Sequence, residues 1–157
     1  MPSQPGDPLS YTGFPNVAID AFSSREWELL VRLPGRVIVA ATHAGHPRRS
    51  VQEGLAGLEA MAAGRAFDSD LVRAVVAAVY AERLSTAEPA RDLLAECRAA
   101  LKILNQRADP ADSAAYRQWV QSIAARVCSA GRGPAGGQLG PADRRFLADL
   151  GHALGMV

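Results

Sequence analysis

Residues 109–130 read DPADSAAYRQWVQSIAARVCSA and predict a long helix that ends near Ala130. Asp109 is placed to cap the first turn, Pro110 suits the first helical position, and Asp112 adds the negative charge that a helix N-terminus favours. The apolar residues recur at helical spacing, and they are Tyr116, Trp119, Val120, Ile123 and Val127. Because such a stripe is stable only when it is buried, this segment predicts one helix of a packed bundle.

Three other segments carry apolar stripes at the same spacing. Asp68 is placed to cap the earliest of them, while Pro141 and Asp143 fit the first turn of the last. The stripes are Val72, Val75, Val76 and Val79, then Leu93, Leu94, Cys97, Leu101 and Leu104, and finally Phe146, Leu147, Leu150 and Leu154. Each stripe is expected to face the core.

The segment at residues 22–41 begins with the strongest local signal for a helix start. Ser23 and Glu26 fit a capping box, and Phe22 with Trp27 fits the hydrophobic staple that accompanies it. Pro34, followed by glycine, is expected to end this helix, since proline disfavours helical conformation in the preceding residue. The apolar run at 37–41 then predicts a separate, buried helix.

A second capping box, Ser50 with Glu53, predicts an amphipathic helix over residues 51–62. Its apolar residues Val51, Leu55, Leu58 and Ala62 are expected to face the core. Gly54 and Gly57 weaken a helix by about 1 kcal/mol each relative to alanine. We expect close packing against a neighbouring backbone to compensate for that loss.

These segments together predict an all-α protein, a compact helical bundle of about six or seven helices in one domain at residues 16–157. Proline and glycine interrupt residues Met1 to Pro15, which are expected to form a flexible amino-terminal tail. The 157 residues include 48% hydrophobic ones, enough to bury a core without disulfides. The glycine-rich loop at 131–140 lacks the GK[ST] ending of a phosphate-binding loop, so no cofactor is expected.

Charge and cysteine content narrow the expected partners and location. Seventeen basic and sixteen acidic residues give a net charge of +1, which predicts neither nucleic-acid nor membrane binding. No apolar run approaches the roughly 20 residues of a membrane span, and no signal-peptide pattern opens the chain. Cys97 and Cys128 form no CxxC motif and lie on apolar helix faces, so core packing in a reducing cytoplasm is expected.

Two groups of polar residues are candidate sites. His43 and His46, with a carboxylate from Glu53 or Asp149, would hold a metal that activates water for hydrolysis. The alternative is that both histidines are exposed loop residues, since two ligands do not complete a site. His46 also joins two arginines in a basic turn before a helix N-terminus, where an anion or an acidic partner could bind. Those arginines are Arg48 and Arg49, and ordinary solvated charge is the alternative.

Two stretches resemble the tellurite-resistance TerB-like helical proteins. They are VIVAATHAGHPRRSVQEGL at 37–55 and LGPADRRFLADLGHALGM at 139–156, about a quarter of the chain. Ser50 and Glu53 match the helix start of that family, whereas His43, Ala44 and Gly45 replace its alanine-aspartate-glycine turn. The resemblance implies a helical fold and an association with bacterial stress-related or regulatory assemblies, and it does not carry over the family's metal site.

No nucleophile, base and metal set is assembled in the sequence, which favours a scaffold over a catalyst. The sequence therefore predicts a non-enzymatic bacterial helical module that binds a protein partner or a small ligand through a groove on the bundle. Two alternatives stay open. One is a metal-dependent hydrolase that uses His43, His46 and Glu53, and the other is an obligate subunit of a homo-oligomer whose apolar stripe continues across a symmetric interface.

Overall fold

The computed structural model describes residues 19–44, 51–82, 89–131 and 139–156. These residues form six packed α-helices and one short 3₁₀ turn, and no strand occurs among them. The helices are α2 (Ser24–Ala44), α3 (Val51–Ala62), α4 (Asp70–Ala81), α5 (Leu93–Arg107), α6 (Pro110–Ala130) and α7 (Pro141–Ala153), with η2 (Ala63–Ala66) after α3. The all-α prediction is confirmed. The predicted tail, Met1 to Pro15, lies outside these residues.

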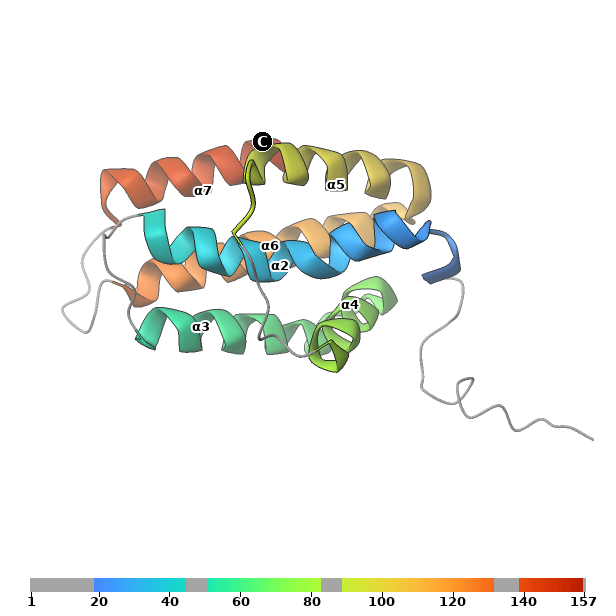
Figure 1. Ribbon diagram of the computed structural model, residues 1–157, viewed down its shortest axis with the longest axis horizontal. Coiled ribbons are helices and arrows are strands. Elements are labelled where there is room, and N and C mark those ends of the chain that lie inside the picture. The colour runs from blue at the N-terminus through green and yellow to red at the C-terminus, as the bar shows by residue number, and fades with distance from the viewer. Residues whose placement is uncertain (1–18, 45–50, 83–88, 132–138, 157) are drawn as a thin grey trace, which may run out of the picture.

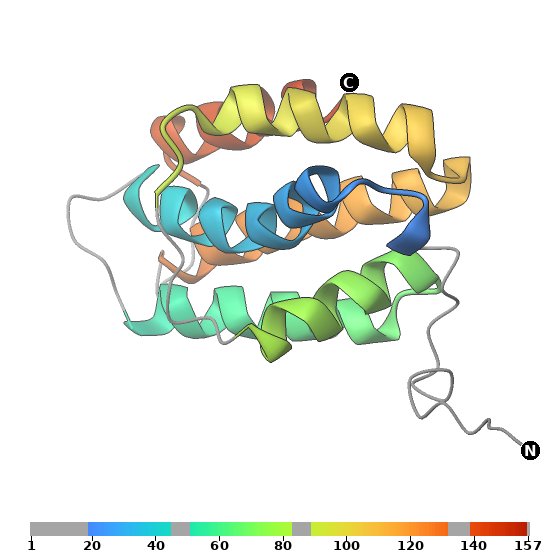
Figure 2. The ribbon, with the colours of Figure 1, turned by 45° about the vertical axis from the view of Figure 1, so that its right-hand side comes forward.

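Helix α6 is the centre of the bundle. It contacts each of the other five helices, and its predicted stripe is fully buried. Figures 1 and 2 show α5 and α7 on one side of α2 and α6, with α3 and α4 on the opposite side. Trp119 and Tyr116 are the largest buried side chains, and their rings meet edge to face with centroids 5.9 Å apart. The sequence pattern of α6 thus identifies the core correctly, from its cap at Asp109 to its end at Ala130.

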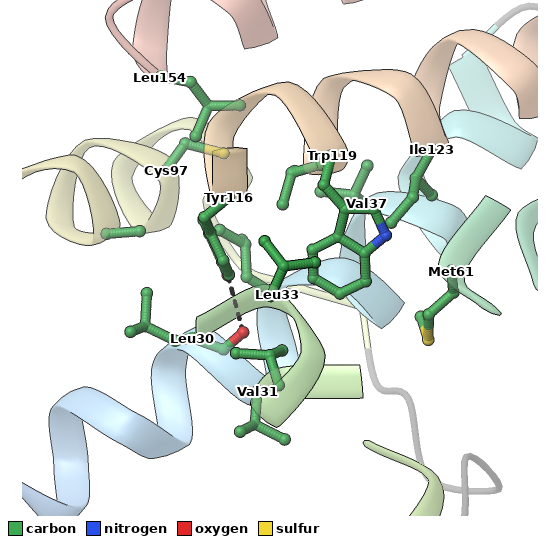
Figure 3. Packing of buried hydrophobic residues seen from close by; sticks show 14 of the residues in the cluster. Leu30, Val31, Leu33, Val37, Met61, Cys97, Tyr116, Trp119, Ile123 and Leu154 are labelled. Atoms are coloured by element: carbon green, nitrogen blue, oxygen red, sulfur yellow. Dashed lines mark hydrogen bonds between the residues drawn. The ribbon is translucent and has the colours of Figure 1, made fainter. Parts of the chain in front are cut away.

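The prediction that Pro34 ends the first helix is wrong. Helix α2 continues through this buried proline to Ala44 and absorbs the segment predicted as a separate helix. A proline inside a helix deprives the carbonyl four residues earlier of its hydrogen-bond donor. The carbonyl affected is that of Leu30, and the Tyr116 hydroxyl donates a hydrogen bond to it at 2.7 Å (Figure 3). A side chain from α6 therefore replaces the missing amide.

The predicted start of this helix is confirmed atom by atom. The Ser23 amide donates to Glu26 Oε1 at 2.8 Å, and the Glu26 amide donates to Ser23 Oγ at 3.2 Å. The Ser23 amide also holds the pKa of the Glu26 carboxyl below its ordinary value. The rings of Phe22 and Trp27 lie 6.0 Å apart between centroids, as the staple requires.

Helix α4 is capped one residue later than predicted. Ser69, and not Asp68, lies at the cap, where its Oγ accepts the Val72 amide at 3.2 Å. The same hydroxyl donates to Asp112 in the first turn of α6 at 2.7 Å. Because Ser69 is buried between two helix starts and Asp68 is exposed, the serine satisfies polar groups that the aspartate does not reach.

The apolar stripes of α4, α5 and α7 face the core, as predicted. All four valines of the α4 stripe are buried, and so are Cys97 and Leu104 of α5 and Leu150 with Leu154 near the end of α7. The remaining residues of the α5 and α7 stripes are partly buried, and they are Leu93, Leu94, Leu101, Phe146 and Leu147. The stripe predicted for α3 behaves differently, and it leads to the candidate site.

Candidate functional site

The face of α3 that was predicted to enter the core is exposed instead. Val51 is 79% exposed, Leu55 54% and Leu58 41%, although the three lie on one side of the helix at helical spacing. The buried face consists of Glu53, Gly57, Ala60 and Met61. The amphipathic pattern of α3 is real, but Val51, Leu55 and Leu58 lie on the outside of the bundle, and Met61 is the large apolar side chain of α3 that enters the core.

The small residues of α3 explain this orientation. A Cβ atom added to Gly57 would lie 2.8 Å from the Ile38 side chain of α2, closer than real Cβ atoms approach. In η2, directly after α3, a Cβ on Gly64 would lie 2.7 Å from the indole nitrogen of Trp119. Because α2 leaves no room for a branched side chain at position 57, α3 packs Gly57 against it and turns Val51, Leu55 and Leu58 outward.

An apolar groove of about 380 Å³ lies between α2 and α3. Helix α2 supplies one wall and α3 the other, and the lining residues are Gly35, Ile38, Val39, Val51, Gly54, Leu55 and Leu58. No charged or polar side chain is among them. At Gly54 an added Cβ would meet nothing within 4 Å, so this glycine opens onto a hollow beside the Leu55 side chain. We call these seven residues the α2–α3 groove.

The other exposed large apolar side chains of the described residues belong to different parts of the fold. Six are exposed in total, and the three outside α3 are Ile19, Tyr80 and Met156. Scattered apolar residues are normal on a protein surface, whereas a contiguous patch marks an interaction site. The α2–α3 groove is therefore the surface feature of the described residues that is best suited to bind a partner.

The residues predicted to hold a metal are only partly described. His43 is exposed in the last turn of α2, where its Nδ1 lies 2.7 Å from the Val39 carbonyl oxygen. Glu53 is buried in the first turn of α3, Asp149 is exposed on α7, and His46 lies outside the described residues. Among the residues that are described, no group of three or more histidine, cysteine or acidic side chains could hold a metal ion.

The predicted anion or partner contact at the basic turn lies wholly outside the described residues. His46, Arg48 and Arg49 belong to the segment at 45–50, between α2 and α3. The same segment contains Ser50 of the second predicted capping box. Both the anion site and this helix cap therefore remain predictions.

The two cysteines are buried, free thiols, as predicted. Burial raises the pKa of the Cys97 thiol to about 12. Burial, and next the nearby Asp143 carboxylate, raises the pKa of the Cys128 thiol to about 12 as well. A thiol with such a pKa stays protonated near neutral pH and is a poor nucleophile, which agrees with a packing role in the core.

Comparison of the chain with family models, with curated proteins and with solved structures finds no match. None of the helices in the described part of the chain is both long and apolar enough to cross a membrane.

Proposed function

We propose that this protein is a non-enzymatic bacterial protein-interaction module that binds its partner through the α2–α3 groove. One observation carries the proposal: three large apolar side chains of α3, Val51, Leu55 and Leu58, lie outside the protein's own core and border an apolar hollow. Leaving them in water forgoes roughly 1.5–3 kcal/mol for each side chain that could be fully buried. A partner that covers this face recovers part of that free energy.

The shape of the groove favours a protein partner over a small ligand. Small-molecule sites enclose most of the ligand surface and orient it through a few polar groups. The α2–α3 groove has no polar side chain in its lining, and its walls include Val51, the most exposed large apolar residue of the described chain. An open apolar groove between two helices suits instead the apolar side chains of another helix, which enter at helical spacing.

The resemblance to TerB-like proteins suggests the kind of assembly in which this binding takes place. We propose a stress-related or regulatory assembly, in which the bundle acts as a rigid scaffold and the groove as its contact surface. The metal-dependent hydrolase stays an alternative: the described residues include no group of three or more histidine, cysteine or acidic side chains that could hold a metal, and His46 lies outside them.

Site-specific photocrosslinking in the source cell tests the proposal. A photoreactive amino acid is placed at Leu55 in the groove and, as a matched control, at Ala77, which is exposed on α4. We expect protein adducts from position 55 that are absent from position 77. Equal adducts at both positions, adducts of small molecules alone, or no adducts at position 55 would each contradict the proposal.

A further inference from the structure

We infer that the partner in the α2–α3 groove is a second copy of this chain, packed with its α3 antiparallel to the first about a twofold axis near Leu55. The inference rests on the proposed function, since it names the protein that the groove binds. A twofold axis requires a surface that is complementary to itself, because the same patch is used by both protomers.

The groove contains both a knob and a hole at neighbouring positions. Leu55 projects from the surface with about half of its area exposed. Beside it, Gly54 opens onto space in which an added Cβ meets nothing within 4 Å. When two copies meet face to face, Leu55 of each protomer can enter the hollow above Gly54 of the other. Helices pack together in this way, with side chains of one filling spaces on the next.

The spacing of the exposed residues fits a helix-to-helix contact. Val51, Leu55 and Leu58 lie at positions i, i+4 and i+7, the pattern of a seam between two packed helices. The seam is about 10 Å long, since each residue advances a helix by 1.5 Å. No charged side chain interrupts it, and the cores of protein interfaces are likewise depleted of charge.

Charge selects the antiparallel arrangement. Glu59 is exposed on α3 four residues after Leu55, and Val51 begins the helix four residues before it. An axis at Leu55 therefore places Glu59 of each protomer beside the first turn of the partner's α3, where the helix dipole favours a negative charge. The two Glu59 residues are then roughly 12 Å apart along the helix, whereas a parallel arrangement would bring like charges together.

The size of the patch predicts a reversible dimer. A standard interface buries about 800 Å² on each partner. Full burial of a valine or leucine side chain accounts for roughly 60–120 Å², so three partly exposed ones supply only the centre of such an interface. We expect a dissociation constant on the order of micromolar, with monomers and dimers both populated.

Sedimentation velocity on the purified full chain measures this equilibrium across the micromolar range. The average mass is expected to rise from monomer to dimer with concentration. Leu55→Glu should raise the dissociation constant at least about tenfold, because a twofold interface receives the substitution twice. Ala77→Glu on α4 should leave it unchanged. Since Leu55 is half-exposed, both variants should melt close to the wild type, and that melt is measured first.

Gly54→Leu distinguishes a contact that depends on shape complementarity from nonspecific hydrophobic association. It makes the surface more apolar but fills the hollow that receives Leu55 of the partner. The inference predicts a dissociation constant at least about tenfold higher for this variant as well. Tighter association would mean that any apolar contact suffices, and would overturn the inference.

Crosslinking with a short bismaleimide tests the orientation. Leu55→Cys, on the axis, should link to itself. Val51→Cys should link to Glu59→Cys when the two variants are mixed, and neither should link efficiently to itself. The buried native thiols should give little background, because each has a pKa near 12. Self-linking of Val51→Cys in preference to the mixed product would contradict the antiparallel arrangement.

A monomer at every concentration would overturn the dimer. If photocrosslinks at Leu55 to another protein then persisted in the cell, the proposed function would stand with a different partner. If those crosslinks were also missing, both proposals would fall.

Discussion

Replacing Tyr116 with phenylalanine tests the contact that allows α2 to pass through a proline. The substitution keeps the aromatic ring and its edge contact with Trp119, but it removes the hydroxyl that donates to the Leu30 carbonyl. That carbonyl is buried, and Pro34 offers it no amide. Leaving a buried acceptor without a donor costs about 1–3 kcal/mol, which is the loss of unfolding free energy expected here.

The cause of this loss is isolated by adding Pro34→Ala. Alanine restores an amide that can donate to the Leu30 carbonyl within the helix. The proline substitution should therefore be more favourable in the Tyr116→Phe background than in the wild type, by about 1–2 kcal/mol. Pro34→Ala alone also removes the packing of the proline ring and raises the conformational entropy of the unfolded chain. The difference between the two backgrounds cancels both effects and isolates the hydrogen bond.

Urea unfolding followed by far-ultraviolet circular dichroism gives the four free energies of the cycle. Tyr80→Phe, at an exposed tyrosine of α4, is the matched control and should change stability by less than about 0.5 kcal/mol. The reasoning would be refuted if Tyr116→Phe cost no more than this control. It would also be refuted if the two substitutions were additive within about 0.5 kcal/mol.

Gly54→Ala should raise the unfolding free energy by about 0.5–1 kcal/mol, because alanine favours the helix and its Cβ meets open space. Gly57→Ala should lower it, because the same atom would collide with the Ile38 side chain, and equal effects of both in urea melts would contradict the assigned orientation of α3. Trp119→Ala should cost about 3–5 kcal/mol, and a loss below about 1 kcal/mol in the same assay would exclude a core role. Stability should fall as pH rises from 9 towards 12: Cys97 and Cys128 keep their protons when folded, with a pKa of about 12, and release them near 9.0 when unfolded. Unfolding curves across this pH range should show that the unfolding free energy of Cys97→Ala falls less steeply than that of the wild type. An equally steep fall would contradict the raised pKa of Cys97 in the folded protein.

Features that depend on neighbours in the sequence were predicted well. The capping box at Ser23 and Glu26 involves residues three apart, and the start of α6 at Asp109 needs only the next few residues. The stripe of α6 was also identified correctly, because a helix that touches all the others buries whatever apolar face it has. In these places local preference and tertiary packing agree.

The errors occur where a distant residue decides the outcome. Nothing near Pro34 in the sequence reveals that Tyr116, more than eighty residues later, supplies a donor to the Leu30 carbonyl. The buried face of α3 was mistaken for a similar reason. Its hydrophobic pattern indicates Val51, Leu55 and Leu58, but the space left by Ile38 admits only glycine at position 57. Sequence periodicity reports which side chains are apolar and does not report the room available to them.

The mistaken face of α3 is also the strongest indication of function. Local preference, apolar patterning and packing agree in most of a natural protein, and disagreement tends to occur at functional positions. Here the pattern of α3 specifies a buried seam, whereas the bundle buries the opposite face and leaves that seam in water. Helix α3 therefore has two faces suited to close packing. The buried face packs within the bundle, and the exposed face is free to pack against another protein. The inner partners are α2 and α6, and the outer face, with its Leu55 knob and Gly54 hollow, is the surface on which we propose that a second copy of the chain packs.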